Sequence, residues 1–99
     1  MIHVVAIITA RPGQRPALLK AFQAVVPMVR SEAGCIEYGA TVDVAGADPA
    51  FGPDSFVVIE KWESRAALTT HSTAAHMNAF RASTGDLVKS TSVHVLEPA

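Results

Sequence analysis

Residues 55–63 have the sequence SFVVIEKWE, and this stretch decides the architecture. Its β-branched and aromatic composition is typical of a strand. Successive side chains of a strand point to opposite faces, so Phe56 and Val58 lie on one face while Val57 and Ile59 lie on the other. A sheet with one solvent-exposed face would alternate apolar and polar residues. Both faces of this strand are therefore predicted to be covered.

Three more stretches have strand composition, at residues 1–9, 35–42 and 90–96. Residues 43–54 contain two glycines and two prolines, so we expect a loop longer than a tight hairpin turn. Helical patterns follow the first and third strands. The resulting order, β-α-β-β-α-β, predicts an α+β fold of the ferredoxin-like type.

The first helix is expected from residue 14 to about residue 33, because its apolar residues recur at steps of three and four. Pro27 is expected to kink or divide this helix, and Gly34 to close it. In the second helical region, Ser64 can cap a short helix. A further helical segment is expected to start at residue 72 or 73.

The composition favours a small domain that associates with itself. The 99 residues are expected to form one domain over 1–99, in which 49% of the residues are hydrophobic and 17% are charged. That is more apolar than a small monomer surface usually is. The two helical regions can cover one face of the sheet. A second copy is therefore predicted to cover the other face, which makes the protein a homodimer.

Charge and cysteine content argue against several other partners. The formal net charge is −1 and no basic run is present, which disfavours nucleic acid as a partner. The apolar stretch near the N-terminus is too short to span a bilayer and follows no positive segment, so we expect neither membrane insertion nor a signal peptide. The single cysteine, Cys35, excludes an internal disulfide and a cysteine-cluster metal site. It is expected to be a buried structural thiol in a cytoplasmic protein.

Three motifs in the central part of the chain resemble one protein family. Residues 31–38, SEAGCIEY, contain E-x-G-C-x-x-Y, and residues 56–62 end in E-x-W. Residues 67–80 contain A-L-x-x-H followed by T-x-x-H-x-x-x-F. In this order and spacing, the motifs resemble those of the antibiotic biosynthesis monooxygenase (ABM) domain family.

The resemblance implies a dimeric α+β barrel in which two sheets pack face to face and each subunit has a pocket between its sheet and its helices. Some members oxidise quinols or polyketide phenols with O2 without a metal or organic cofactor. We therefore expect a small cofactor-independent monooxygenase whose substrate is a quinol or a related small aromatic. The alternatives are a non-catalytic ligand-binding or interaction module on the same fold, and a haem-binding or haem-degrading member.

The haem-degrading branch is disfavoured at three positions. Its members have an axial histidine where this chain has Arg81, a tryptophan where it has His71, and an asparagine near Ala6. A haem-binding member in which His76 is the axial ligand remains an alternative.

His71 is the candidate catalytic residue. It follows Leu68 by three positions, so it shares the inward face of its helix and could accept a phenol proton. The alternative is a core histidine bonded to a carbonyl or a carboxylate. His76 lies one turn before Phe80, and both are candidates for contact with the substrate. The alternative for His76 is a role in helix packing, in capping or in bracing His71.

No metal site is predicted from the two histidines. His71 and His76 are five residues apart, which separates them by about 140° on one continuous helix. A break near Ser72 could bring them closer, but the sequence shows no clear third or fourth ligand.

The E-x-W strand supplies two more candidate substrate contacts. Glu60 and Trp62 share a face, where Glu60 could orient a histidine or bind a substrate hydroxyl and Trp62 could stack on a flat ring. The alternatives are an ion pair of Glu60 with Arg65 or Arg81, and simple packing for Trp62. Tyr38 could hydrogen-bond a ligand or anchor the dimer.

Overall fold

The computed structural model describes residues 1–99 and contains four strands and three helices. In chain order these are β1 (Ile2–Ala10), α1 (Arg15–Arg30), β2 (Cys35–Thr41), β3 (Ser55–Trp62), α2 (Arg65–Ser72), α3 (Ala75–Thr84) and β4 (Val88–Leu96). The predicted ferredoxin-like α+β order is confirmed, with the second helical region divided into α2 and α3.

The four strands form one antiparallel sheet in the order β2-β3-β1-β4. The two central strands, β3 and β1, are the most apolar, as expected for strands with neighbours on both sides. Val4 is opposite Glu60 in the register, and Ala6 is opposite Val58. All four side chains therefore lie on the same face of the sheet.

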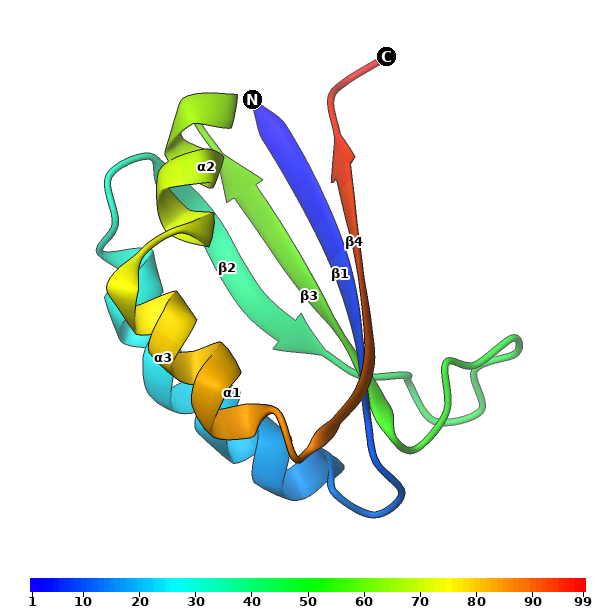
Figure 1. Ribbon diagram of the computed structural model, residues 1–99. Coiled ribbons are helices and arrows are strands. Elements are labelled where there is room, and N and C mark those ends of the chain that lie inside the picture. Colours follow the sequence, from blue (N-terminus) through cyan, green and yellow to red (C-terminus); the bar gives the residue numbers. More distant parts are fainter.

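All three helices cover that same face (Figure 1). The core between them and the sheet includes Val4, Phe22, Phe56 and Trp62, each at most 1% exposed. No helix has both the length and the apolar content that a bilayer span requires.

The end of α1 differs from the sequence-based expectation in two respects. Pro27 lies inside a continuous helix and does not divide it, and the alternative of a kink stays a prediction. The helix ends at Arg30, so Gly34 lies beyond its cap, in the turn that leads into β2. Gly34 has φ +84°, and a Cβ there would lie 2.6 Å from the Cβ of Ala67. Glycine therefore allows this turn to lie directly against α2.

The expected break in the second helical region is present. Ser64 caps α2, and its Oγ accepts a hydrogen bond from the backbone N–H of Ala67 at 3.1 Å. After α2 ends, Thr73 and Ala74 change direction, and Ala74 has an extended conformation before α3 begins. His71 and His76 consequently lie on different helices.

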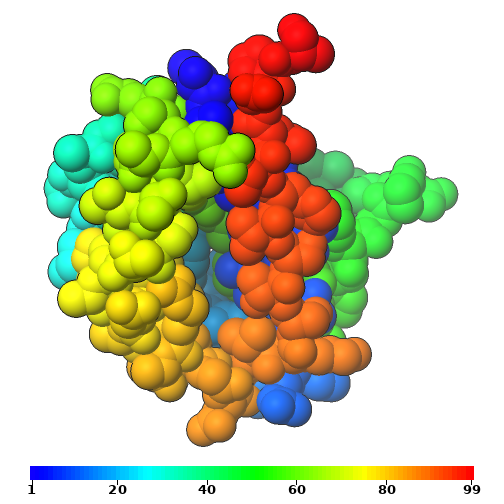
Figure 2. Space-filling model, turned by 45° about the horizontal axis from the view of Figure 1, so that its top comes forward, coloured from blue at the N-terminus to red at the C-terminus, as the bar shows by residue number.

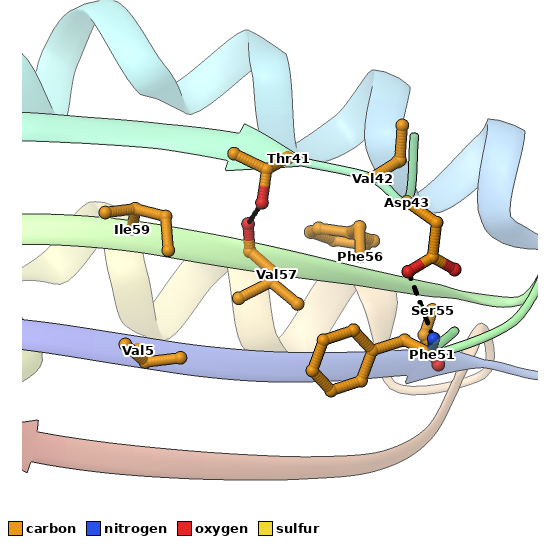
Figure 3. Close-up of a pocket in the computed structure, with 9 residues that line it drawn as sticks. All are labelled: Val5, Thr41, Val42, Asp43, Phe51, Ser55, Phe56, Val57 and Ile59. Carbon is orange, nitrogen blue, oxygen red and sulfur yellow. Dashed lines mark hydrogen bonds between the residues drawn. The ribbon is translucent and has the colours of Figure 1, made fainter. Parts of the chain in front are cut away.

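The opposite face of the sheet has no helix over it (Figure 1). Val5, Val57 and Ile59 lie on this face beside Phe51 of the β2–β3 loop, around a hollow of about 340 Å³ (Figure 3). Phe51 is 57% exposed. The two-sided apolar pattern of β3 is thus real, and the second copy expected over this face stays a prediction.

Candidate active site

A cavity of about 450 Å³ lies between the sheet and the helices. Its wall is mostly apolar and includes Val4, Ala6, Phe22, Val58, Leu68, Met77 and Phe80. The polar side chains on the wall include Tyr38, Glu60, His71 and Arg81. In Figure 2 the molecule is hollowed between the surface of α2 and α3, which runs from yellow-green to orange, and the orange and red surface of β4. An apolar pocket with a few converging polar groups is typical of a small-molecule site.

His71 lies in the last turn of α2 and is 5% exposed. Its ring packs on the indole of Trp62, with 4.6 Å between the ring centroids, and against the ring of Tyr38 at 5.3 Å. These two aromatic side chains leave the imidazole little freedom to rotate. The structure therefore places His71 on the cavity wall in a fixed orientation.

Glu32 links His71 to His76. The Nδ1 atom of His71 lies 3.0 Å from Oε2 and 3.2 Å from Oε1 of Glu32, and the Nε2 atom of His76 lies 2.6 Å from Oε2. The alternative in which His71 bonds a carboxylate is thus what the structure shows, and the carboxylate belongs to Glu32 rather than Glu60. Because Glu32 engages Nδ1, Nε2 is the ring nitrogen of His71 that remains for a molecule in the cavity.

Sequence reasoning missed Glu32 as a site residue. It lies in the turn after α1, which Gly34 allows to approach α2 closely. The backbone N–H of Glu63 donates to the Gly34 carbonyl at 2.9 Å and fixes this turn beside the end of β3. The available signal was the first position of the E-x-G-C motif, which places a carboxylate two residues before the glycine.

Glu60 and Trp62 share a face, as predicted, and they contact each other. The indole Nε1–H of Trp62 donates to Oε1 of Glu60 at 2.9 Å. Glu60 makes no ion pair with Arg65 or Arg81. Burial raises the pKa of its carboxyl, an effect that the indole hydrogen bond partly offsets. Glu60 lines the cavity, whereas Trp62 lies behind the wall and supports His71.

Tyr38 is 3% exposed and lies on the helix side of the sheet, with its ring stacked on Phe22 at 5.4 Å. Burial, reinforced by the negative charge of Glu60, raises the pKa of its hydroxyl. The hydroxyl therefore keeps its proton at neutral pH and can donate a hydrogen bond to a ligand oxygen.

The remaining predicted residues lie at different depths. Phe80 is on the cavity wall, edge-on to Phe22 at 6.2 Å. His76 is not on the wall and lies behind His71, bonded to Glu32. Arg81 donates to the Ser72 carbonyl at 2.6 Å and to Asn78 Oδ1 at 2.9 Å.

Cys35 is a half-buried free thiol. Burial raises its pKa, and the negative charges of Glu32 and Glu60 add to the effect. A thiol that keeps its proton is a poor nucleophile, which supports a structural role.

One group of side chains has the composition of a metal site. The ligand atoms of Glu32, His71 and His76 all lie within 4.8 Å of one another. No clear third ligand for the two histidines is evident from the sequence, and the fold supplies Glu32 as a candidate.

Comparison with known proteins places this site in a family. Residues 1–83 match the family described as "Antibiotic biosynthesis monooxygenase". The chain belongs to the ABM family. All three motifs on which the resemblance was drawn fall inside the matched region, and Tyr38, Glu60 and His71 bring one side chain from each to the cavity.

Individual relatives and solved structures match nearly the whole chain. It is 39% identical over 102 residues to the "Probable quinol monooxygenase YgiN" of Escherichia coli strain K12, a match that covers 99% of this chain and 98% of that protein. Among solved structures, PA3566 from Pseudomonas aeruginosa superposes with a TM-score of 0.83 at 30% identity, covering 99% of this chain and 93% of that one. Rv0793 from Mycobacterium tuberculosis superposes with a TM-score of 0.82 at 30% identity, covering 99% and 94%.

Proposed function

We propose that the protein is a cofactor-independent monooxygenase that oxidises a quinol or a related small aromatic with O2. One observation carries this proposal: His71 lies on the wall of an apolar cavity while Glu32 engages its Nδ1 atom. Membership of the ABM family and the name of the 39% identical relative support the reaction class.

In the first step, a substrate hydroxyl donates its proton to His71. When Glu32 accepts a hydrogen bond from Nδ1–H, the lone pair of the imidazole is on Nε2, the ring nitrogen that Glu32 does not engage, and His71 lines the cavity. The Glu32 carboxylate also stabilises the imidazolium that forms when Nε2 takes the proton. His71 can therefore act as a general base at this wall.

Other wall residues suit an aromatic diol. The protonated hydroxyl of Tyr38 can donate to an oxygen of the substrate, and the ring of Phe80 offers a flat apolar surface. The cationic side chain of Arg81 also lines the cavity, where it favours the ionised form of a bound phenol.

The substrate can supply all the electrons of the reaction. Ground-state O2 is a triplet and reacts slowly with closed-shell molecules, but an ionised quinol is electron-rich enough to transfer one electron to it. One oxygen atom then enters the ring and the other leaves as water, so a quinol and O2 give a hydroxyquinone and water. The quinol loses four electrons in this balance, and no external reductant is required.

The test is oxygen uptake by chelator-treated protein with a panel of one-ring and two-ring quinols. The matched control substrates are the corresponding dimethyl ethers, which have no proton to lose. The proposal is supported if the protein raises oxygen uptake above the buffer rate with the quinols but not with their dimethyl ethers. The product should then also contain one labelled oxygen atom from ¹⁸O2. Binding of quinols without any enzyme-dependent uptake would instead indicate a ligand-binding module, and a Soret band in the purified protein would indicate a haem protein.

A further inference from the structure

The cluster of Glu32, His71 and His76 gathers ligand atoms from three separate elements. Glu32 comes from the turn after α1, His71 from α2 and His76 from α3. Their side chains are 14%, 6% and 21% exposed, so the cluster is sheltered but can be reached past His76. It lies on the side of His71 that faces away from Nε2, because Nδ1 is the atom turned toward it.

The donor set is that of a zinc-type site. Two imidazoles and one carboxylate, with a fourth position left for water, are a common arrangement around Zn²⁺. With metal–ligand bonds of about 2.0–2.2 Å, tetrahedral ligand atoms lie about 3.3 Å apart. The Glu32 oxygens are now 2.6 to 3.2 Å from the two histidine nitrogens. Glu32 therefore needs to separate from each histidine by less than about an ångström to admit the ion, and the two histidine nitrogens already lie within 4.8 Å of each other.

Charge also favours a cation at this point. When both imidazoles are neutral, the carboxylate gives the cluster one negative charge. Arg81 is held by the Ser72 carbonyl and Asn78, and it makes no ion pair with Glu32. The packing of Trp62 and Tyr38 on the His71 ring fixes the orientation of one ligand in advance.

We propose that Glu32, His71 and His76 form a binding site for a divalent transition-metal ion of the zinc type. Two imidazole ligands select Zn²⁺, Co²⁺ and Ni²⁺ over Mg²⁺ and Ca²⁺, which prefer oxygen ligands. Each chain binds one ion, and a water molecule completes the coordination.

Metal binding has a direct consequence for His71, and this part rests on the proposed function. An ion on Nδ1 forces the remaining proton of the neutral ring onto Nε2, where the ring then donates rather than accepts a hydrogen bond. His71 cannot take a substrate proton in that state. Zinc at this site therefore inhibits proton abstraction in the cavity.

The binding test is titration of chelator-treated protein with ZnCl2 by calorimetry, with MgCl2 as the control ion. Wild type is expected to bind one Zn²⁺ per chain and no Mg²⁺. Glu32→Gln and His76→Gln should each weaken zinc binding at least tenfold. The matched controls Glu63→Gln and His94→Gln alter residues outside the cluster and should bind like wild type.

Two results would overturn the site: wild type that binds no zinc, or His76→Gln and Glu32→Gln that both bind as tightly as wild type. His76 is partly exposed, so His76→Gln is expected to stay folded, which circular dichroism checks.

The inhibition is tested separately: stoichiometric zinc should abolish quinol-dependent oxygen uptake in wild type. Stoichiometric binding that leaves the uptake rate unchanged would contradict the inhibition. If no quinol is oxidised, the proposed function fails while the calorimetric result still decides the metal site.

Discussion

Glu32 determines which nitrogen of His71 is available to a substrate. Its carboxylate contacts Nδ1 of His71 at 3.0 Å and Nε2 of His76 at 2.6 Å. In Glu32→Gln, the side-chain amide can still occupy this place but no longer carries the charge that stabilises an imidazolium. We expect kcat/KM for quinol oxidation to fall by about tenfold or more in metal-free protein, a part of the full general-base effect.

The matched control for this variant is Glu63→Gln, which alters an exposed glutamate directly after β3 that lines no part of the cavity. It should keep the wild-type kcat/KM. Equal kcat/KM values for Glu32→Gln and wild type would mean that the carboxylate has no part in orienting or charging His71.

At this scale, the sequence allowed part of the site to be predicted. Helical spacing from Leu68 placed His71 on the inward face, and strand alternation placed Glu60 beside Trp62. Glu32 was not singled out, because its role depends on a turn packing against two helices that lie 39 and 44 residues further along the chain. Helical and strand periodicities describe one element at a time and do not predict such a contact.

The turn between α1 and β2 depends on Gly34. Its φ of +84° disfavours any side chain, and an added Cβ would lie 2.6 Å from Ala67. We expect Gly34→Ala to lower the free energy of unfolding by about 2–5 kcal/mol, the sum of a left-handed conformation and an overpacked contact. Urea denaturation measures this change.

Gly13→Ala is the control for backbone conformation alone. Gly13 has φ +77°, but nothing lies within 4 Å of an added Cβ. Gly13→Ala should lower the free energy of unfolding by about 1–2 kcal/mol. If Gly34→Ala and Gly13→Ala lower the free energy of unfolding by the same amount, the close approach of the turn to α2 contributes nothing to the cost of Gly34→Ala.

The β2–β3 loop is held by Asp43. Its two carboxylate oxygens accept hydrogen bonds from the backbone N–H groups of Phe51 at 3.0 Å and Gly52 at 2.9 Å. These bonds lower the pKa of the carboxyl from its usual 3.8. A lowered pKa in the folded state stabilises the protein above the usual value, and this contribution disappears as the pH falls through the folded-state pKa.

We therefore expect the difference in unfolding free energy between wild type and Asp43→Asn to be constant near neutral pH and to shrink below pH 3.8. Denaturation curves across the acidic range measure it. A difference that stays constant down to the lowest pH would show that ionisation of Asp43 does not contribute to stability.

At the scale of elements, strand composition predicted all four strands, and helical spacing predicted the helices. That Pro27 does not divide α1 has a physical reason. A proline inside a helix removes one hydrogen bond and crowds the preceding turn, and the packing of Phe22, Val26 and Val29 in the core keeps the helix continuous.

The whole molecule has helices on one face of its sheet and apolar side chains on the other (Figures 1 and 3). We predict that a second copy covers the open face, so light scattering at low micromolar concentration should give about twice the chain mass of 10.4 kDa. Ile59→Lys puts a charge on that face and should give monomers. Met28→Lys, on the exposed side of α1, should stay dimeric.

A wild-type protein that is monomeric under these conditions would contradict this prediction. The two-sided pattern of β3 made the open face predictable from the sequence, because alternation assigns each residue to a face. How a second copy is placed on that face depends on the shape of two surfaces, which one-dimensional patterns do not contain.

The central claim is that His71 accepts the substrate proton, and it is tested most directly by kcat/KM for quinol oxidation in His71→Gln. Glutamine keeps some of the size and hydrogen bonding of histidine but is not a base near neutral pH. For folded, metal-free protein in the oligomeric state of the wild type, we predict a decrease of about 10²-fold or more relative to wild type. Wild-type kcat/KM in His71→Gln would contradict the account and leave His71 as a packing residue.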